Sequence, residues 1–346
     1  MDFTFSAEQD QLRAATRAFL ETRAPSAYVR EMVEDDRGFT DDFWSAVVDM
    51  GWTELPTLLD MTVVLEETGR LPLPGPFFSA GVLAPLAARG LGLTAPDGRG
   101  TVALEELGHG DPIDRVRTRA RRKGGAWLLN GEKPLVLDGH SADWVIVVAR
   151  TDAGLQSFLV ERPDAQSVPT LDPTRKAARM HFDDTPSELV GPIGDHTAIW
   201  RRVADDAAVA LCAELVGSSE RALFLASEYA KVRVQFDRPI ATFQAIKHKA
   251  AEMLHQLELL RVGTHYAAWT SDVDDPDRER AAAMAKGYAG EAAVNITGES
   301  IQIHGGVGFT WDCDAHFHYR RAKAVDLMLG YQGWQRQRVA DLVLNR

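Results

Sequence analysis

Two short stretches of the sequence carry residue types that could do chemistry. The first, VRVQFDRPIATFQAIKH, covers residues 232–248 and places Arg233, Gln235 and Phe236 just before an Asp-Arg-Pro turn. An arginine can offer charge-assisted hydrogen-bond donors to an anion. The dipole at the end of an expected helix also favours a cation such as Arg233, whether or not it binds a ligand. Gln235 and Phe236 could simply pack at the corner between two helices. Taken alone, this stretch leaves both interpretations open.

The second stretch, IQIHGGVGFTWDCDAHFHYRRAKA, covers residues 301–324. Its Gly305-Gly306 pair follows an apolar helical pattern, and glycine is the usual residue at a left-handed helix stop. A helix stop does not explain the polar and aromatic residues that crowd around it, namely Gln302, His304, Trp311, His316 and Arg320. This stretch alone does not say what those side chains do.

The sequence lacks the motifs of several other kinds of binding or catalytic site. The GxGxxG, Walker A, GxSxG and HExxH motifs are absent, so nothing points to a Rossmann dinucleotide site, a P-loop, a hydrolase elbow or a zinc protease. The two cysteines, Cys212 and Cys313, have no CxxC spacing, which indicates neither a disulfide framework nor a zinc site. We expect two buried thiols in a reducing cytoplasm and no bound metal.

The composition of the chain limits the classes of protein to which it can belong. The chain has 346 residues, 45% hydrophobic and 25% charged, with a formal net charge of -12. Such a chain can form two or three globular domains, and its acidity argues against nucleic acid or an anionic membrane as the main partner. The N-terminus, MDFTFSAEQDQLR, is acidic and amphipathic, unlike a signal peptide, and no apolar run approaches the ~20 residues of a membrane span. We therefore expect a cytosolic protein.

Hydrophobic periodicity divides the chain into three parts. Residues 1–95 are expected to be helical, with a first helix starting at Ser6 and further helices at 41–50, 60–67 and 78–89. Residues 96–195 are expected to form a β domain with strands at 101–104, 144–149, 157–160 and 178–182. A hairpin is expected to join 116–122 to 126–129 through Gly124-Gly125.

The third part, residues 196–346, returns to helical periodicity. Four long helices are expected at 204–231, 243–270, 278–303 and 322–345, the last interrupted near Gly330 and Gly333. Four long antiparallel helices form a bundle. The predicted order is therefore helices, a β domain and a helical bundle.

As a pair, the two stretches resemble the C-terminal domain of the acyl-CoA dehydrogenase family. They match its R-x-Q-F-x-R-P-I-x-x-F-Q-A-I-K-H and Q-x-H-G-G-x-G-F-T-W segments. The N-terminal MDFTFSAEQDQLR, DMGW and VVLEETG segments and the middle LLNGEK and SADWVIVVART segments extend the resemblance over the whole chain. The resemblance implies an α+β fold with an N-terminal helical domain, a middle β-sandwich or barrel, and a C-terminal four-helix bundle.

The resemblance also implies a cofactor and its ligands. Family members bind FAD at a subunit interface, where one chain's β domain holds the flavin ring and its neighbour's bundle holds the pyrophosphate and adenine end. By similarity, Arg233 would pair with the pyrophosphate, Gln235 and Phe236 would flank the cofactor, and Gln302 with the Gly305-Gly306 backbone would meet the adenosine part. Asp237 stands where the family usually has glycine, a mild departure because Asp tolerates turn geometry.

Larger departures affect the flavin ring and the catalytic base. Where the family has Thr-Glu-Pro and Trp-Ile-Thr segments, this chain reads VALEELGHGDP and LVL at 135–137, and Leu137 cannot donate a hydroxyl hydrogen bond to a flavin. Leu329 occupies the place of the glutamate that removes the α-proton of the acyl-CoA, and it cannot act as a base. The resemblance therefore implies no catalytic residue at this position.

Some family members carry the base on the first long helix of the bundle, a position that corresponds to Ala207 here. Asp205 and Asp206 lie one and two residues away, which rotates them around a helix by about 100 to 200°. A solvated or helix-start role is the expected one for both. The segment between Trp52 and Val63, TELPTLLDMT, is also shorter than in the family, which would open the acyl pocket to a bulky group.

These departures predict one subunit of an α2β2 acyl-CoA dehydrogenase. This chain would donate the pyrophosphate and adenine half of the FAD site, while a paralogous partner carries the catalytic glutamate. The chain looks most like small subunits of actinobacterial enzymes that act on CoA-linked steroid side chains, with a branched or polyketide-derived acyl-CoA as the next substrate class. Two FADs per tetramer and an electron-transfer flavoprotein as acceptor would follow.

Two other interpretations stay open. The chain could be a flavin-free, homo-oligomeric family member with a binding or structural role, or a self-sufficient homotetramer whose base is Asp205 or Asp206. The contacts to CoA are not readable from the sequence, because Arg119, Arg121 and Arg122 fit a solvated hairpin face equally well.

Overall fold

The first helix shows how local sequence sets the fold. In the computed structural model, which describes residues 5–108 and 110–344, α1 (Ala7–Arg23) starts directly after Ser6. The Ser6 hydroxyl accepts a hydrogen bond from the Gln9 N–H at 3.2 Å, and the Gln9 side chain accepts one from the Ser6 N–H at 3.1 Å. This reciprocal pair is a capping box, and the predicted start at Ser6 is confirmed.

Three predicted features lie partly outside the described residues. They are the start of the N-terminal MDFTFSAEQDQLR segment (residues 1–4), His109 of the VALEELGHGDP segment, and the end of the fourth bundle helix (residues 345–346).

The described residues form two compact units. We call residues 5–30, 56–73 and 208–344 the helical unit, and residues 31–55, 74–108 and 110–207 the barrel unit. Two helices, α2 (Ser26–Glu34) and α6 (Thr197–Val232), contribute residues to both. The predicted boundaries near residues 95 and 195 stay predictions.

The barrel unit is built around one sheet of seven strands. The strands are β1 (Gly100–Ala103), β2 (Arg119–Lys123), β3 (Ala126–Leu137), β4 (Trp144–Thr151), β5 (Gly154–Glu161), β6 (Gln166–Val168) and β7 (Ala177–Val190). The order of six strands is β1-β4-β2-β3-β7-β5, and β6 pairs with β7 off this path. Strand β5 also pairs with β4, which closes the sheet into a barrel. Every predicted strand is confirmed, and β6 was not foreseen because it has only three residues.

The predicted hairpin is also confirmed. Arg119 pairs with Asn130 and Lys123 with Ala126, and Gly124 and Gly125 between them have φ angles of 60° and 92°. Positive φ at both positions is the geometry of a tight hairpin turn, and glycine adopts it without strain.

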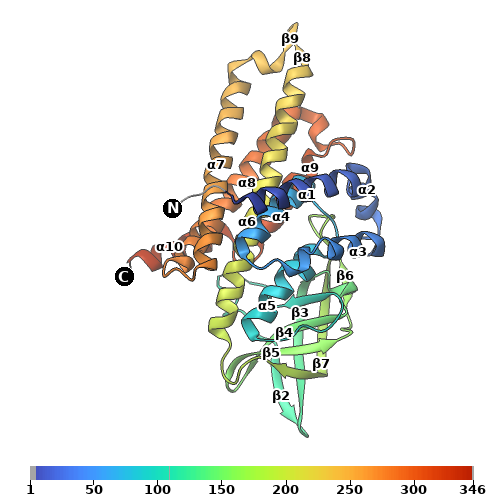
Figure 1. Ribbon diagram of the computed structural model, residues 1–346, viewed down its shortest axis with the longest axis vertical. Helices are drawn as coiled ribbons and strands as arrows, with labels where there is room; N and C mark the ends of the chain where they lie inside the picture. The colour runs from blue at the N-terminus through green and yellow to red at the C-terminus, as the bar shows by residue number, and fades with distance from the viewer. Residues whose placement is uncertain (1–4, 109, 345–346) are drawn as a thin grey trace. The chain divides into compact units, whose positions relative to one another are not determined.

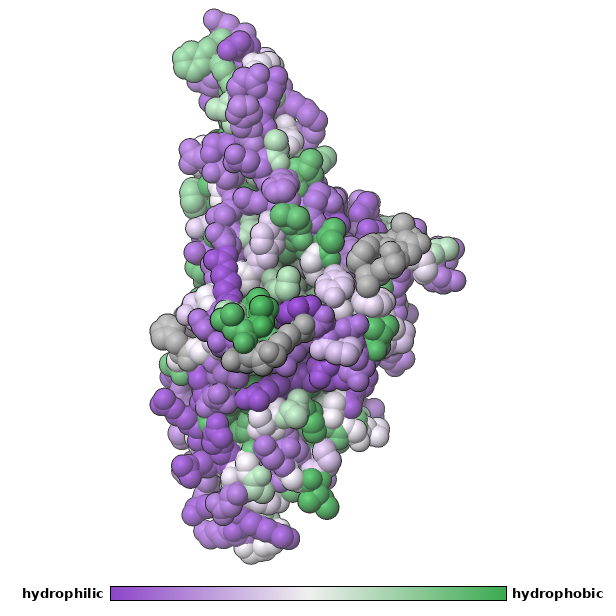
Figure 2. Space-filling view, turned by 90° about the vertical axis from the view of Figure 1, so that its left-hand side faces the viewer, coloured by the Kyte–Doolittle hydropathy of each residue, from purple (hydrophilic) through white to green (hydrophobic). Residues whose placement is uncertain are grey.

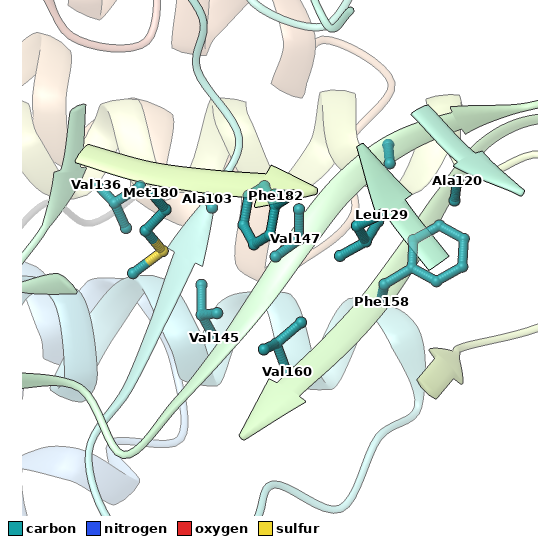
Figure 3. Packing of buried hydrophobic residues seen from close by; sticks show 11 residues of the cluster. Ala103, Ala120, Leu129, Val136, Val145, Val147, Phe158, Val160, Met180 and Phe182 are labelled. Atoms are coloured by element: carbon teal, nitrogen blue, oxygen red, sulfur yellow. The ribbon is translucent and has the colours of Figure 1, made fainter. Parts of the chain in front are cut away.

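Inward-facing side chains fill the barrel (Figure 3). Phe158, Leu129 and Val147 are fully buried and belong to one cluster with Met180 and Phe182 of β7. The helices of this unit are α3 (Asp41–Asp49), η1 (Trp52–Glu54), η2 (Phe77–Leu83), α5 (Ala84–Leu91) and η3 (Gly139–Ser141). Both η2 and α5 contact β1.

The helical unit contains the long helices of the C-terminal half (Figure 1). Its elements are α1, α4 (Leu58–Arg70), the second part of α6, β8 (Val234–Gln235), β9 (Arg238–Pro239), η4 (Ile240–Thr242), α7 (Gln244–Asp272), α8 (Arg278–His304), η5 (Gly305–Phe309), α9 (Ala315–Leu327) and α10 (Gln332–Leu344). Helix α8 contacts α7, α9 and α10. The predicted order of helices, β domain and helical bundle is therefore confirmed.

The fourth bundle helix was predicted at 322–345 with interruptions near Gly330 and Gly333; the break near Gly330 is present, but the predicted start and the interruption at Gly333 are wrong. Two helices, α9 and α10, occupy this region, and α9 begins seven residues earlier, at Ala315. The chain leaves the helix at Met328, and Leu329 and Gly330 reverse it with φ angles of 53° and 90°. Gly333 lies inside α10 and does not interrupt it.

The face of the molecule in Figure 2 is mostly hydrophilic, and its apolar side chains form small separate groups. Among residues 5–108 and 110–344, every helix is too short or too polar to cross a bilayer.

Candidate functional site

The two motif stretches meet at neighbouring helix ends in the helical unit. Helix α6 ends at Val232, directly before Arg233, and α8 ends at His304, directly before Gly305. The Tyr229 ring on α6 stacks on the His304 ring on α8, with centroids 4.7 Å apart and planes 29° apart. Further from these helix ends, the Ser300 hydroxyl on α8 donates a hydrogen bond to the Ala222 carbonyl on α6 at 2.8 Å. The stretches quoted from the sequence therefore form one local surface.

Between α6 and α7 the chain makes the small β8–β9 hairpin, labelled in Figure 1. Its central residues, Phe236 and Asp237, have φ angles of 53° and 60°, the left-handed pair that a type I′ turn requires. Asp tolerates this region, whereas for a bulky phenylalanine it is an outlier of the kind that is concentrated at functional sites. Phe236 is 87% exposed, and its ring makes only an edge contact with Phe243 at 6.1 Å.

The main chain of Arg233 is fixed while its guanidinium is not. The Arg233 N–H donates to the Tyr229 carbonyl at 2.9 Å, and its carbonyl accepts from the Ile240 N–H at 2.8 Å. The side chain is exposed and forms no hydrogen bond or ion pair with any residue that the structure describes. Five N–H donors therefore face solvent from a positioned backbone.

Three residues at the end of α8 are also exposed to solvent. Gln302, Gly305 and Gly306 are exposed, and Gly305 has φ 62° and ψ -144°. A Cβ atom added at Gly305 or Gly306 would have no neighbour within 4 Å. Glycine is thus needed at 305 for its backbone conformation and leaves the main chain accessible to a ligand.

Two other residues of this stretch lie inside the unit. His304 is 7% exposed, with Nδ1 at 2.7 Å from the Ser300 carbonyl. His316 is 3% exposed, stacks on Trp311, and has no hydrogen-bond partner for either ring nitrogen within the described chain. Burial, with Arg320 and Arg30 nearby, lowers the pKa of His316, so its imidazole is neutral near pH 7. These histidines shape the surface and do not face it.

Sequence reasoning missed Tyr229, which joins the two stretches. It lies one helical turn before Arg233, and its stacking partner His304 was noted only as part of the crowd around the glycines. Its position four residues before Arg233 was readable from the sequence, whereas its stack on His304, which joins two helices, was not.

The turn at Leu329 is firmly held and carries no proton acceptor. Leu329 is 5% exposed, and its carbonyl accepts from Gln335 Nε2 at 3.1 Å. Fully buried Lys286 donates from Nζ to the carbonyls of Val325 and Asp326 at 3.0 Å, and to that of Gly330 at 3.3 Å. The packing of this turn leaves a leucine where the family resemblance places a glutamate.

The alternative base position, in the barrel unit, holds no carboxylate either. Ala207 is fully buried, and Asp206 pairs with Arg202 at 3.9 Å one turn away. Asp205 is 6% exposed, so the expectation that it is solvated is wrong. The expected helix-start role is also wrong for both, because α6 begins at Thr197, two turns earlier.

The flavin-ring segments of the family resemblance are structural here. Leu137 is 9% exposed, and its carbonyl accepts from the Thr101 hydroxyl at 2.7 Å. Glu106 Oε1 accepts from Lys133 Nζ at 2.9 Å and from the Thr118 hydroxyl at 2.7 Å. Burial alone would raise the pKa of the Glu106 carboxyl, but Lys133 and the Thr118 bonds outweigh it and hold that pKa below its usual range.

The two cysteines differ. Cys212 is fully buried, and burial raises the pKa of its thiol to about 12, so it is unreactive near neutral pH. Cys313 is only partly buried, so the prediction of two buried thiols is wrong for it.

Comparison with known proteins decides the family. A model for the acyl-CoA dehydrogenase C-terminal domain matches residues 194–344. Acyl-CoA dehydrogenase IpdE2 of Mycobacterium tuberculosis is 34% identical over 326 residues, which span 91% of this chain and 91% of that relative. The chain belongs to the acyl-CoA dehydrogenase family. The resemblance seen in the sequence is confirmed.

Solved structures of the family show the same fold. A variant of the Tcur3481-Tcur3483 steroid ACAD is 28% identical, covers 98% of both chains and superposes with a TM-score of 0.87. A chain of the ChsE4-ChsE5 complex from Mycobacterium tuberculosis is 25% identical, covers 100% of both chains and has a TM-score of 0.89. Acyl-CoA dehydrogenases are oxidoreductases that generally depend on FAD. Two of the structural relatives of this chain come from assemblies named for two different components.

Proposed function

We propose that this chain is one subunit of a heteromeric, FAD-dependent acyl-CoA dehydrogenase. It would donate the pyrophosphate and adenine half of a flavin site to a paralogous partner. The observation that carries the proposal is the joined surface at the ends of α6 and α8, where Arg233 has no partner among the described residues and the Gly305-Gly306 backbone is open. A guanidinium beside an open glycine backbone has chemistry that suits a phosphate-bearing ligand.

The residues present fit the donated half of FAD. Arg233 would bind pyrophosphate oxygens through its free donors, Gln235 and Phe236 would flank the cofactor, and Gln302 with the glycine backbone would contact the adenosine part. The exposed, left-handed Phe236 supports a ligand-facing role, because strain at an exposed aromatic persists where function requires it. When bound, FAD would take up the hydride that leaves the acyl-CoA.

The same chain lacks what proton abstraction requires. Leu329 and Ala207 stand at the two places where the family carries its glutamate, and both are buried apolar residues. We infer that the α-proton is removed by a glutamate of the partner subunit. The catalytic role of this chain would be to complete the cofactor site.

The partner and substrate follow from the relatives. The structural relatives include one named as a steroid ACAD and one described as a two-protein complex, which supports an α2β2 assembly and a bulky steroid side-chain CoA as substrate. Only three residues separate η1, which ends at Glu54, from α4, which starts at Leu58; so short a connection supports an open acyl pocket. Lipid catabolism in the cytoplasm, with an electron-transfer flavoprotein as acceptor, completes the proposal.

Flavin content and acyl-CoA oxidation test it. The chain would be purified alone and after co-expression with a paralogue that has an intact glutamate. We expect little flavin and no turnover alone, and two FADs per α2β2 tetramer with activity in the mixed complex. One FAD per subunit with turnover in the chain alone would contradict the proposal, and a stable flavin-free homo-oligomer that ignores the paralogue would favour a binding or structural role.

A further inference from the structure

The helical unit contains a second cationic site, away from the two motif stretches. A pocket of about 130 Å³ lies among α1, α4 and α6, and three arginines line it: Arg17, Arg70 and Arg221. Leu20 and Leu71 supply apolar wall. A smaller hollow of about 10 Å³ adjoins it and shares Arg70, Leu71 and Arg221.

Two of the three arginines are already neutralised. Arg17 forms two hydrogen bonds to the Glu67 carboxylate, at 2.7 and 2.9 Å. Arg70 pairs with Glu220 at 2.9 Å and lies 3.6 Å from Glu67. These pairs hold α4 against α1 and α6 and leave both guanidinium groups fixed at the edge of the pocket.

Arg221 is different. It makes no hydrogen bond or ion pair with any described residue, and its guanidinium lies over the Phe224 ring, 5.1 Å from the centroid. Burial, and then the neighbouring charge of Arg70, lower the pKa of Arg221, while Asp314 and Glu21 act from beyond ion-pair distance. A half-buried cation beside another cation is unfavourable unless an anion or water meets its donors.

The shape and the charges of the pocket favour a carboxylate over a dianion such as phosphate. A guanidinium binds a carboxylate through two parallel hydrogen bonds. Because Glu21 and Glu67 also line the pocket, a dianion such as phosphate would be repelled more strongly than a monoanion. The apolar wall of Leu20 and Leu71 suits a short hydrocarbon chain, and a cavity of about 150 Å³ can hold a molecule the size of benzene.

We propose that this pocket binds a small aliphatic monocarboxylate, with its carboxylate on Arg221 and its chain against Leu20 and Leu71. By the same scale, about six heavy atoms in total, the carboxylate included, would be the upper limit for a pocket of about 130 Å³, which is the size of butyrate. Every residue given as lining the pocket belongs to this chain and lies outside the two motif stretches, so its test is independent of the proposed function.

The experiment measures binding of butyrate to the full chain in its native assembly by titration calorimetry and thermal unfolding. We expect saturable binding of butyrate, and none of butyramide, which has the same size without the charge. Inorganic phosphate at equal ionic strength should bind at least tenfold more weakly. Arg221→Gln should abolish butyrate binding and, because it removes the uncompensated cation, should not lower the unfolding temperature of the ligand-free protein.

Arg122→Gln, at an exposed arginine of the barrel unit, is the matched control and should bind butyrate like the unmodified chain. Equal butyrate affinity in Arg221→Gln, no saturable binding in the unmodified chain, or tighter binding of phosphate than of butyrate would each overturn the proposal. A ligand-free Arg221→Gln protein that unfolds at a clearly lower temperature would also contradict it, because Arg221 would then be a structural residue.

Discussion

The stacking of Tyr229 on His304, at 4.7 Å between ring centroids, ties the end of α6 to the end of α8. Seventy-five positions separate these rings in the sequence, yet the stack brings the residues that follow each helix to one surface. The surface contains the Arg233 guanidinium, which has no partner among residues 5–108 and 110–344, and an open backbone at Gly305. It is therefore a place where this chain can be tested for the binding of a phosphate-bearing ligand.

Replacement of Arg233 by alanine should release flavin from the mixed complex. A hydrogen bond to a charged group contributes about 1.5–3 kcal/mol, so FAD affinity should fall by about 10- to 100-fold while the fold is unchanged. Flavin fluorescence during dilution of the complex measures the loss. Arg122→Ala, at another exposed arginine, should retain flavin normally, and equal retention by Arg233→Ala would remove Arg233 from the site.

Phe236 and Asp237 can be compared as a pair, because both have a left-handed backbone conformation and an exposed side chain. Phe236→Gly should stabilise the chain purified alone by about 1 kcal/mol, because glycine adopts positive φ without strain. It should also weaken flavin retention in the complex. Asp237→Gly should give a similar or smaller gain in urea unfolding with flavin retention unchanged. If both variants retain flavin equally, the exposed ring of Phe236 has no role in the cofactor site.

Much of the fold could be predicted because its signals are local. Ser6 with Gln9 fixes the start of α1, and Gly124-Gly125 fixes the β2–β3 hairpin, since each device acts within a few residues. The glycines indicated the break near Gly330, but the left-handed Leu329 beside it was not foreseen, because Lys286 holds the surrounding turn from another helix. No local pattern reveals a contact between residues so far apart in sequence.

The candidate site follows the same division. Arg233 and the glycines could be placed at helix ends from the sequence, because helix stops are local signals, whereas their contact with FAD stays a proposal. The burial of individual residues could not be predicted. Asp205 was expected to face solvent but is only 6% exposed, because its environment depends on residues that pack against it from elsewhere in the chain. The arginine pocket was also invisible in the sequence, because Arg17, Arg70 and Arg221 come from three separate helices.

The buried Lys133 predicts a specific pH dependence of stability. Burial lowers the pKa of Lys133 from 10.5 to about 8, against the opposing effect of Glu106. Between these two pH values the unfolded chain holds a proton that the folded chain has lost, so this group makes the free energy of unfolding rise with pH. Below pH 8 both states are protonated, and its contribution no longer changes. The full rise is about 3 kcal/mol, at 1.36 kcal/mol per pKa unit.

Urea unfolding at several pH values between 8 and 10.5 measures this rise. Lys133→Met should flatten the curve relative to the unmodified chain, whereas Lys123→Met, at a side chain that is 69% exposed, should leave the slope unchanged. Parallel curves for the unmodified chain and Lys133→Met would show that the lysine keeps an ordinary pKa in the folded state.

A close approach of two helix backbones predicts a large effect of a single methyl group. Gly69 on α4 and Gly217 on α6 face each other's helix: a Cβ at Gly217 would lie 1.7 Å from the Glu66 carbonyl oxygen, and one at Gly69 would lie 2.0 Å from that of Glu214. Backbone atoms cannot move aside as a flexible side chain can. Gly217→Ala should therefore destabilise the protein by about 3 kcal/mol or more, through separation of the helices.

Gly263 is the matched control, because it also lies inside a long helix but a Cβ there would have no neighbour within 4 Å. Gly263→Ala should stabilise the protein by about 0.5–1 kcal/mol, since alanine loses less conformational entropy in a helix. The free energies of unfolding in urea for the two variants should thus change in opposite directions. A Gly217→Ala variant as stable as the unmodified chain would show that α4 and α6 do not approach as closely as the structure has them.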